Sequence, residues 1–358
     1  MRIRKVGSHV LLDRYHLVTV ETDEGISGVG EISAINAAVT HAIVERALAP
    51  LILGQDPLEI TRLWRTMYHT PVKLGPMGAL LEAIAGIDIA LWDISGKAAG
   101  RPVYELLGGK VRDEVSVYAS SMSREMTPLE EARRAASFRE KGYHGYKIHS
   151  ATPWMYDIGP DQTVETTREV RVAVGDDFPV MVDVNCAYLP HTALKIARIL
   201  EDLNVFHFEE PLAAHDYPGY ATLTRDVAIP IAAGEQEYTK WQFRELILQA
   251  EVDIVQPDVI KCGGITEFVK IAALAETFNK PVTVHNVQPT VGTMAHMHVC
   301  VSTPMCIYPQ EYNIEHHPLR DDTPIWKEPV LVENGVIRVP DRPGLGVELD
   351  LDVVSKLS

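Results

Sequence analysis

The sequence predicts an α/β fold in which a (β/α) TIM-type barrel carries an N-terminal α+β capping domain. Between Tyr146 and Glu311, short apolar runs repeatedly end in a charged or metal-binding side chain, and consecutive ends lie 23 to 27 residues apart. One buried parallel strand, an amphipathic helix and two loops together have about that length. The recurring ends are Asp183, Glu209, Glu235, Asp258, His285 and Glu311.

Two upstream runs bring the number of predicted strands to eight, which is the number that closes such a barrel. EVSVYAS surrounds Tyr118, and GYKIH contains Lys147 and His149. Active groups of these barrels gather at the carboxyl ends of the strands. We therefore expect the residues at the strand ends to form the active site.

The first part of the chain does not follow this repeat. HLVTVETDEGISGVGE alternates apolar and polar residues around Asp23-Glu24-Gly25, which predicts a β-hairpin. Helical patterns then cover residues 37–51, 57–68 and 78–100, and small residues recur in the last of them. We predict three parts: a capping domain at 1–113, a barrel at 114–318, and a C-terminal segment at 319–358 that packs back on the capping domain.

Two further segments depart from the barrel pattern. ATPWMYDIGPDQ follows the second predicted strand, so Trp154 and Tyr156 are expected either to overhang the active site or to pack on the scaffold. EPVLVENGVIRVP predicts a second hairpin, with its turn at Asn334-Gly335.

Composition narrows the classes of partner. The 358 residues have a net charge of −16 and a sequence pI near 5.3, which argues against nucleic acid or an anionic membrane as a partner. No long uncharged apolar window and no apolar signal region occur. The four cysteines lack zinc spacing and are expected to be reduced. We expect a cytoplasmic protein that binds a small molecule or a metal.

Three carboxylates on consecutive strand ends, Asp183, Glu209 and Glu235, would converge and repel one another. A hard divalent cation relieves that repulsion, and ligands that are all oxygen favour Mg²⁺. The alternative is that each carboxylate caps a helix or pairs with a lysine. Their common register favours the metal.

Candidate acid and base groups flank these carboxylates. Lys147 and His149 are two residues apart on a strand and share a face, so the ammonium should keep the imidazole neutral and able to act as a base. Asp258 should orient His285 and stabilise its charged form. Glu311, on the last predicted strand, would complete the ring of charged residues at the strand ends.

The residues predicted at the strand ends resemble the active site of the mandelate racemase subgroup of the enolase superfamily. They are Lys147, His149, Asp183, Glu209, Glu235, Asp258, His285 and Glu311. The resemblance covers almost the whole chain, and it implies Mg²⁺, abstraction of the proton α to a carboxylate, and an enediolate held by the metal. It also implies a symmetric homo-oligomer. The usual second-strand motif is Lys-x-Lys, whereas this chain has His149 in the second position. Lys147 and Glu311 would bind the substrate carboxylate, and Asn185 would add a hydrogen bond.

The predicted function is dehydration of an aldonic or aldaric sugar acid to a 2-keto-3-deoxy acid. Without a leaving group the same residues would act as a racemase, an epimerase or a cycloisomerase. Two rivals are a class I aldolase that uses Lys147 as its nucleophile and an inactive barrel. Candidate specificity residues in the capping domain are His9, Asp13, Arg14, His16 and Lys73.

Overall fold

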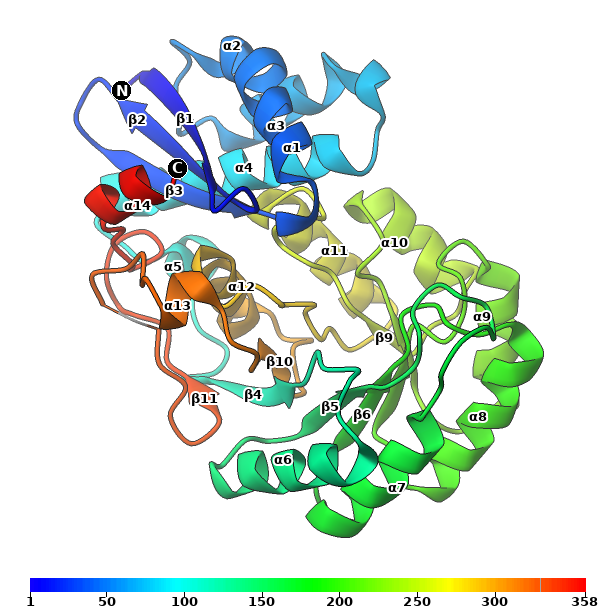
Figure 1. The fold of residues 1–358 in the computed structure, drawn as a ribbon. Coiled ribbons are helices and arrows are strands. Elements are labelled where there is room, and N and C mark those ends of the chain that lie inside the picture. The colour runs from blue at the N-terminus through cyan, green and yellow to red at the C-terminus, as the bar shows by residue number, and fades with distance from the viewer. Residues whose placement is uncertain (329) are drawn as a thin grey trace.

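The computed structural model describes residues 1–328 and 330–358 and confirms the predicted fold class. A capping domain with a three-stranded sheet lies over a barrel of parallel strands surrounded by helices (Figure 1). Most of the apolar core lies within the barrel and reaches under the capping sheet, and a second cluster lies within the capping domain. Both ends of the chain lie at the capping domain (Figure 1).

The capping sheet is antiparallel, in the order β1-β2-β3. β2 (Tyr15–Thr22) and β3 (Ser27–Ile32) form the predicted hairpin, with its turn at residues 23–25. β1 (Ile3–Leu11) was not predicted from the sequence. Its buried and exposed residues do not alternate regularly, so it lacks the period of two that identifies a strand.

The helices of the capping domain occupy the three segments predicted for them. The first segment contains one π-helical turn, Val44–Leu48. The helices are α1 (Ala37–Ile43), α2 (Ala49–Ile52), α3 (Ile60–His69) and α4 (Ala79–Ala99), followed by α5 (Val103–Leu106). Among the described residues, no helix is both long enough and apolar enough to pass through a membrane.

The small residues of α4 allow it to lie directly against β3. A Cβ atom on Gly30 would be 1.9 Å from the carbonyl oxygen of Gly86, and one on Gly86 would be 2.4 Å from Ile32. No side chain fits between the two backbones at this crossing. The contact explains why the sequence places glycines on both elements.

The barrel strands are parallel and follow the chain order β4 to β9, with β10 beside β4. The strands are β4 (Val115–Ser120), β5 (Tyr146–His149), β6 (Val180–Asp183), β7 (His207–Glu209), β8 (Ile231–Ala233), β9 (Ile254–Val255) and β10 (Gln310–Asn313). The helices after them are α6 (Pro128–Glu140), α7 (Thr163–Val174), α8 (Pro190–Asp202), α9 (Tyr217–Asp226), α10 (Thr239–Leu248), α11 (Ile265–Thr277) and α12 (Val291–Ser302). Thr127 and Glu130 form a capping box at the start of α6.

The seventh predicted strand is present only as a short extended segment. Val282 forms one bridge with Val255 of β9 and makes no regular ladder with β10. Instead, the buried Gln310 side chain accepts a hydrogen bond from the backbone of Val284 (2.9 Å) and donates one to the carbonyl of Val282 (3.3 Å). A side chain thus closes the barrel where backbone pairing stops.

Buried polar contacts attach the capping domain to the barrel. Glu31 of β3 accepts hydrogen bonds from Gln288 (2.8 Å), Thr290 (2.6 Å) and the backbone of Gly292 (2.6 Å) at the start of α12. Trp64 donates through Nε1 to the carbonyl of Gly263 at 2.7 Å. A carboxylate at a helix N-terminus is well placed for the helix dipole.

The C-terminal segment contacts both parts of the molecule. A turn at Asn334-Gly335 leads into β11 (Val336–Ile337), which pairs antiparallel with β4 of the barrel. The segment continues through the backbone of Leu345, which donates to Asp93 of α4 at 2.9 Å. It also contains α13 (Pro318–Asp321), and it ends in α14 (Leu351–Leu357), which contacts β1.

Candidate active site

The ladder register places the predicted site residues at one level of the barrel. His149 of β5 lies opposite Asp183 of β6, and Asp183 lies opposite Glu209 of β7. Glu235 follows β8 by two residues, after a glycine with φ 144°. A Cβ atom on that glycine, Gly234, would lie 2.8 Å from the backbone nitrogen of Gln256, so this approach requires glycine.

Asp183, Glu209 and Glu235 form a buried carboxylate triad. One oxygen from each lies within 4.8 Å of the others. Burial alone would raise their pKa values, but neighbouring cationic groups lower all three, so the carboxylates stay anionic. This set of hard oxygen donors, with no histidine or cysteine among them, fits a divalent cation such as Mg²⁺.

Lys147 is a buried cation shared by three carboxylates. Its Nζ lies 2.7 Å from Glu311, 2.8 Å from Glu209 and 3.5 Å from Asp183. Although burial would lower the pKa of Lys147, the charges of Glu209 and Glu311 raise it well above its ordinary value. A Schiff-base lysine needs a neutral amine, so this environment argues against the aldolase mechanism.

His149 is held at both ring nitrogens. Nδ1 is hydrogen-bonded to the backbone carbonyl of Ser121, and Nε2 lies 2.9 Å from Asp183. Because a carbonyl only accepts, Nδ1 carries a proton. The charged group in contact with this ring is the Asp183 carboxylate, whereas the sequence predicted the Lys147 ammonium as its neighbour.

His285 joins the opposite end of the triad to Asp258. Its Nδ1 lies 2.7 Å from Asp258 and its Nε2 lies 2.8 Å from Glu235. Burial would lower the pKa of His285, but the charge of Glu235 and the hydrogen bond to Asp258 raise it well above its ordinary value. His296 also contacts Asp258, at 3.2 Å. The imidazole is thus both oriented and charged.

Two protein-family models match this chain. Residues 8–108 match the family "Mandelate racemase / muconate lactonizing enzyme, N-terminal domain", and residues 130–353 match "Enolase C-terminal domain-like". The chain belongs to the mandelate racemase and muconate lactonizing enzyme group of the enolase superfamily. The resemblance deduced from the strand ends is confirmed.

Similar proteins of this superfamily cover nearly the whole chain. Arabinonate dehydratase from Saccharolobus solfataricus is 34% identical over 91% of this chain and 86% of its own length. D-galactarolactone cycloisomerase from Agrobacterium fabrum is 32% identical over 95% and 90%. A solved mandelate racemase/muconate lactonizing protein from Paracoccus denitrificans, complexed with magnesium, is 31% identical, with a TM-score of 0.94 over 99% of this chain and 96% of that one.

The remaining predicted residues of this superfamily member also lie near the triad. Glu311 is fully buried, and it accepts hydrogen bonds from Ser120 Oγ and from the backbone of Asn286, each at 2.7 Å. Asn185 has a left-handed backbone (φ 42°) and donates to Asp183 through its backbone (2.8 Å) and its side chain (3.2 Å). Its Oδ1 accepts from Arg124.

Sequence reasoning missed several polar residues around the triad. His207 lies two residues before Glu209 on β7, and its Nε2 is 3.2 Å from that carboxylate. The period of two along a strand could have identified it. Arg124 and Lys261 lie in loops, where no period marks them. Lys261 is nevertheless buried.

The candidate specificity residues of the capping domain do not form one group. His16 is fully buried and its ring nitrogens lie 2.6 Å from Ser8 and 2.8 Å from Thr40, so both nitrogens already have partners within the capping domain. His9 contacts Thr19 at 3.0 Å within the same sheet. The other three candidates are exposed: Asp13, Arg14 and Lys73.

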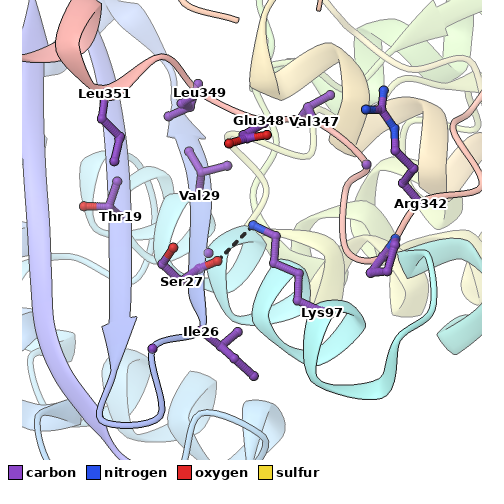
Figure 2. A pocket seen from close by; sticks show the side chains of 14 residues that line it. Thr19, Ile26, Ser27, Val29, Lys97, Arg342, Val347, Glu348, Leu349 and Leu351 are labelled. Atoms are coloured by element: carbon purple, nitrogen blue, oxygen red, sulfur yellow. Dashed lines mark hydrogen bonds between the residues drawn. The ribbon is translucent and has the colours of Figure 1, made fainter. Parts of the chain in front are cut away.

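A cavity of about 520 Å³ lies away from the triad, between the capping sheet and the C-terminal segment (Figure 2). Its cations are already paired. Lys97 donates to the Ser27 carbonyl at 2.9 Å and to Asp93 at 2.6 Å, and Arg342 binds Glu328 at 2.5 Å. The carboxylate triad, and not this cavity, carries groups suited to acid–base chemistry.

Proposed function

We propose that the protein is a Mg²⁺-dependent dehydratase of an aldonic or aldaric sugar acid. The observation that carries the proposal is the position of two imidazoles at opposite ends of the carboxylate triad. His149 directs Nε2 to Asp183, and His285 directs Nε2 to Glu235. Arabinonate dehydratase, at 34% identity, acts on a substrate of this class by its name, which supports the proposal.

Asp183, Glu209 and Glu235 would hold the metal. When bound, Mg²⁺ would stabilise negative charge that develops on the substrate carboxylate. The ammonium of Lys147, fixed by Glu311, adds a buried positive charge beside the same position. These groups favour the loss of a proton from the carbon next to that carboxylate.

His149 would act as the base in this reaction. Since the carbonyl of Ser121 fixes the proton on Nδ1, Nε2 is the nitrogen that would take up the substrate proton, once it is deprotonated and has left its contact with Asp183, whose carboxylate would then hold the metal. The electrons of the broken C–H bond pass into the enediolate of the substrate.

His285 would act as the acid. Its Nδ1–H donates to Asp258, so the proton that it transfers is the one on Nε2, which faces the triad. That proton goes to the β-hydroxyl, which leaves as water as the C–O bond breaks. The resulting enol tautomerises to a 2-keto-3-deoxy acid.

A second function uses the same two imidazoles. If the substrate lacks a leaving hydroxyl in the right position, the acid returns a proton to the other face of the carbon, or a ring bond takes the place of the hydroxyl. A racemase, epimerase or cycloisomerase would result. The 32% identity to D-galactarolactone cycloisomerase supports this alternative.

A substrate screen tests the proposal. Aldonic and aldaric acids of all common configurations would be incubated with the protein and Mg²⁺, and 2-keto acid would be detected with semicarbazide. Formation of 2-keto acid from at least one sugar acid is the expected result. Isomerisation without 2-keto acid would favour the second function, and activity only on substrates that are not sugar acids would refute both.

A further inference from the structure

Arg124 is a cation at the edge of the triad whose hydrogen-bonding groups are only partly used. It lies in the loop between β4 and α6 and is half-buried. Its Nη2 donates to Asn185 Oδ1, and its Nη1 makes one long contact with the carbonyl of Met122, at 3.4 Å. Its Nε is buried and has no hydrogen-bond partner. A buried donor of a charged group without an acceptor is costly.

Glu315, which contacts the same loop through the backbone of Met122, is not available to Arg124. Glu315 accepts from both terminal nitrogens of Arg134, at 2.8 and 2.9 Å, and from the backbone of Met122 at 2.9 Å. Within residues 1–328 and 330–358, no carboxylate forms an ion pair with Arg124. The guanidinium therefore lacks an anion of the protein's own.

Hydrogen bonds connect Arg124 to the reacting groups. Asn185 accepts from Arg124 and donates to Asp183, and Asp183 contacts His149. Burial lowers the pKa of Arg124, whereas the charges of Asp183 and Glu235 act in the opposite direction. Arg124 is thus linked through Asn185 to Asp183, the member of the triad that His149 contacts, and it is close enough to the triad to be affected by its charge.

Lys147 is not available for a second anionic group of the substrate, because three carboxylates already surround its ammonium and its proposed partner is the carboxylate next to the reacting carbon. The substrate carboxylate next to the reacting carbon would be bound by the metal and Lys147. A second cation with free donors, linked through Asn185 to the Asp183 end of the triad, suits a second anionic group. The planar guanidinium matches a carboxylate through two parallel hydrogen bonds.

We propose that Arg124 binds a second carboxylate, at the far end of the substrate, so that the protein prefers aldaric acids to aldonic acids. This inference rests on the proposed function and narrows its substrate class. A hydroxyl group would accept one hydrogen bond from the guanidinium and leave the charge of Arg124 unpaired, so it satisfies Arg124 less well than a carboxylate does.

Matched substrate pairs test this assignment. For each configuration that the wild type converts, kcat/KM would be measured on the diacid and on the corresponding monoacid. The variants would be Arg124→Met, Arg124→Lys, and the control Arg133→Met, which removes an exposed arginine on α6.

Arg124→Met should lower kcat/KM on the diacid by about 10- to 100-fold, the usual effect of losing a charge-assisted hydrogen bond, and change the monoacid value much less. Arg124→Lys should recover part of the loss because it keeps the charge and loses the fork. Arg133→Met should match the wild type. Equal losses on both substrates, no loss on the diacid, or a wild-type preference for the monoacid would each overturn the inference.

A binding measurement separates this inference from the proposed function. If the wild type converts no sugar acid, the proposed function fails, but calorimetric titration of diacids and monoacids with Mg²⁺ still tests Arg124. Selective loss of diacid affinity in Arg124→Met would support the assignment. Diacid affinity that is equal in the wild type and Arg124→Met would refute it. Equal melting temperatures for the variants would show that the fold is intact.

Discussion

His285 and Asp258 share a hydrogen bond of 2.7 Å between Nδ1 and Oδ2, while Nε2 of the same ring lies 2.8 Å from Glu235. The imidazole is therefore fixed in the orientation that presents one proton to the triad. Its protonated form is favoured by two carboxylates in spite of burial. An imidazolium at this position is suited to act as a general acid.

His285→Asn should reduce dehydration by about 10²- to 10⁴-fold, because it removes this acid. Proton abstraction by His149 should continue, so substrate recovered from D₂O should contain deuterium at the α-carbon by mass spectrometry. Asp258→Asn should have a smaller effect of the same kind. Loss of exchange together with elimination would instead identify His285 as the base, and wild-type turnover would remove it from the mechanism.

Metal dependence is the second prediction. EDTA should abolish turnover and Mg²⁺ should restore it, because the triad carboxylates repel one another without a cation. Mg²⁺ should also raise the melting temperature of the wild type by binding the folded state. Glu235→Gln should lose both effects and remain folded. Full activity in metal-free buffer, or an equal thermal shift in Glu235→Gln, would contradict the metal assignment.

Lys147→Met should destabilise the protein as well as inactivate it. The substitution leaves Glu209 and Glu311 buried without their cation, and breaking a buried ion pair typically costs about 3–5 kcal/mol. Urea denaturation with and without Mg²⁺ measures the effect. The loss should be smaller with Mg²⁺, since the metal replaces part of the missing charge. Unchanged stability in metal-free buffer would show that the carboxylates do not depend on Lys147.

Much of the site could be predicted because strand ends recur at a nearly constant interval. That interval correctly aligned Asp183 and Glu209, and His149, 34 residues before Asp183, was added as the end of another apolar run; the ladder register places the three residues in line. Arg124 escaped notice because it comes from a loop, whose residues follow no period. Gln310 escaped for another reason. Its side chain forms the hydrogen bonds that backbone groups of a regular strand pair would form. The apolar run that predicts a strand does not show whether its partner will be a backbone or a side chain.

The capping domain was less predictable than the barrel. β1 lacks regular alternation, and the sequence offered no pattern that ranks His16 among the candidate specificity residues. Ser8 and Thr40 satisfy both nitrogens of its buried ring. Buried histidines of this kind are recognised only when their partners, distant in sequence, are known.

Gly30→Ala should weaken the capping domain. The new methyl group would lie 1.9 Å from the carbonyl oxygen of Gly86, so β3 and α4 would have to separate. Overpacking of this kind typically costs about 1–3 kcal/mol. Ser27→Ala, at an exposed position of the same strand, is the matched control. Equal urea midpoints for the two variants would show that the close approach is not needed.

Glu31 provides a test based on pH. Burial raises the pKa of Glu31 to about 7, against the effect of its hydrogen bonds from Thr290, Gly292 and Gln288. Because this pKa is higher in the folded state than in the unfolded state, the contribution of Glu31 to stability is complete below about pH 4.5. It falls as the pH rises to about 7, by about 3 kcal/mol, and then stays constant.

Glu31→Gln should remove that dependence, since the amide does not ionise. Between pH 5 and pH 7.5, the free energy of unfolding should decrease less in Glu31→Gln than in the wild type. This difference does not depend on the fixed effect of the altered hydrogen bonds. Urea denaturation across this pH range measures the two slopes, and Glu140→Gln, at an exposed position on α6, controls for the change in net charge. If Glu31→Gln and the wild type have parallel pH profiles, Glu31 is already ionised in the folded protein at low pH, and the three donors outweigh its burial.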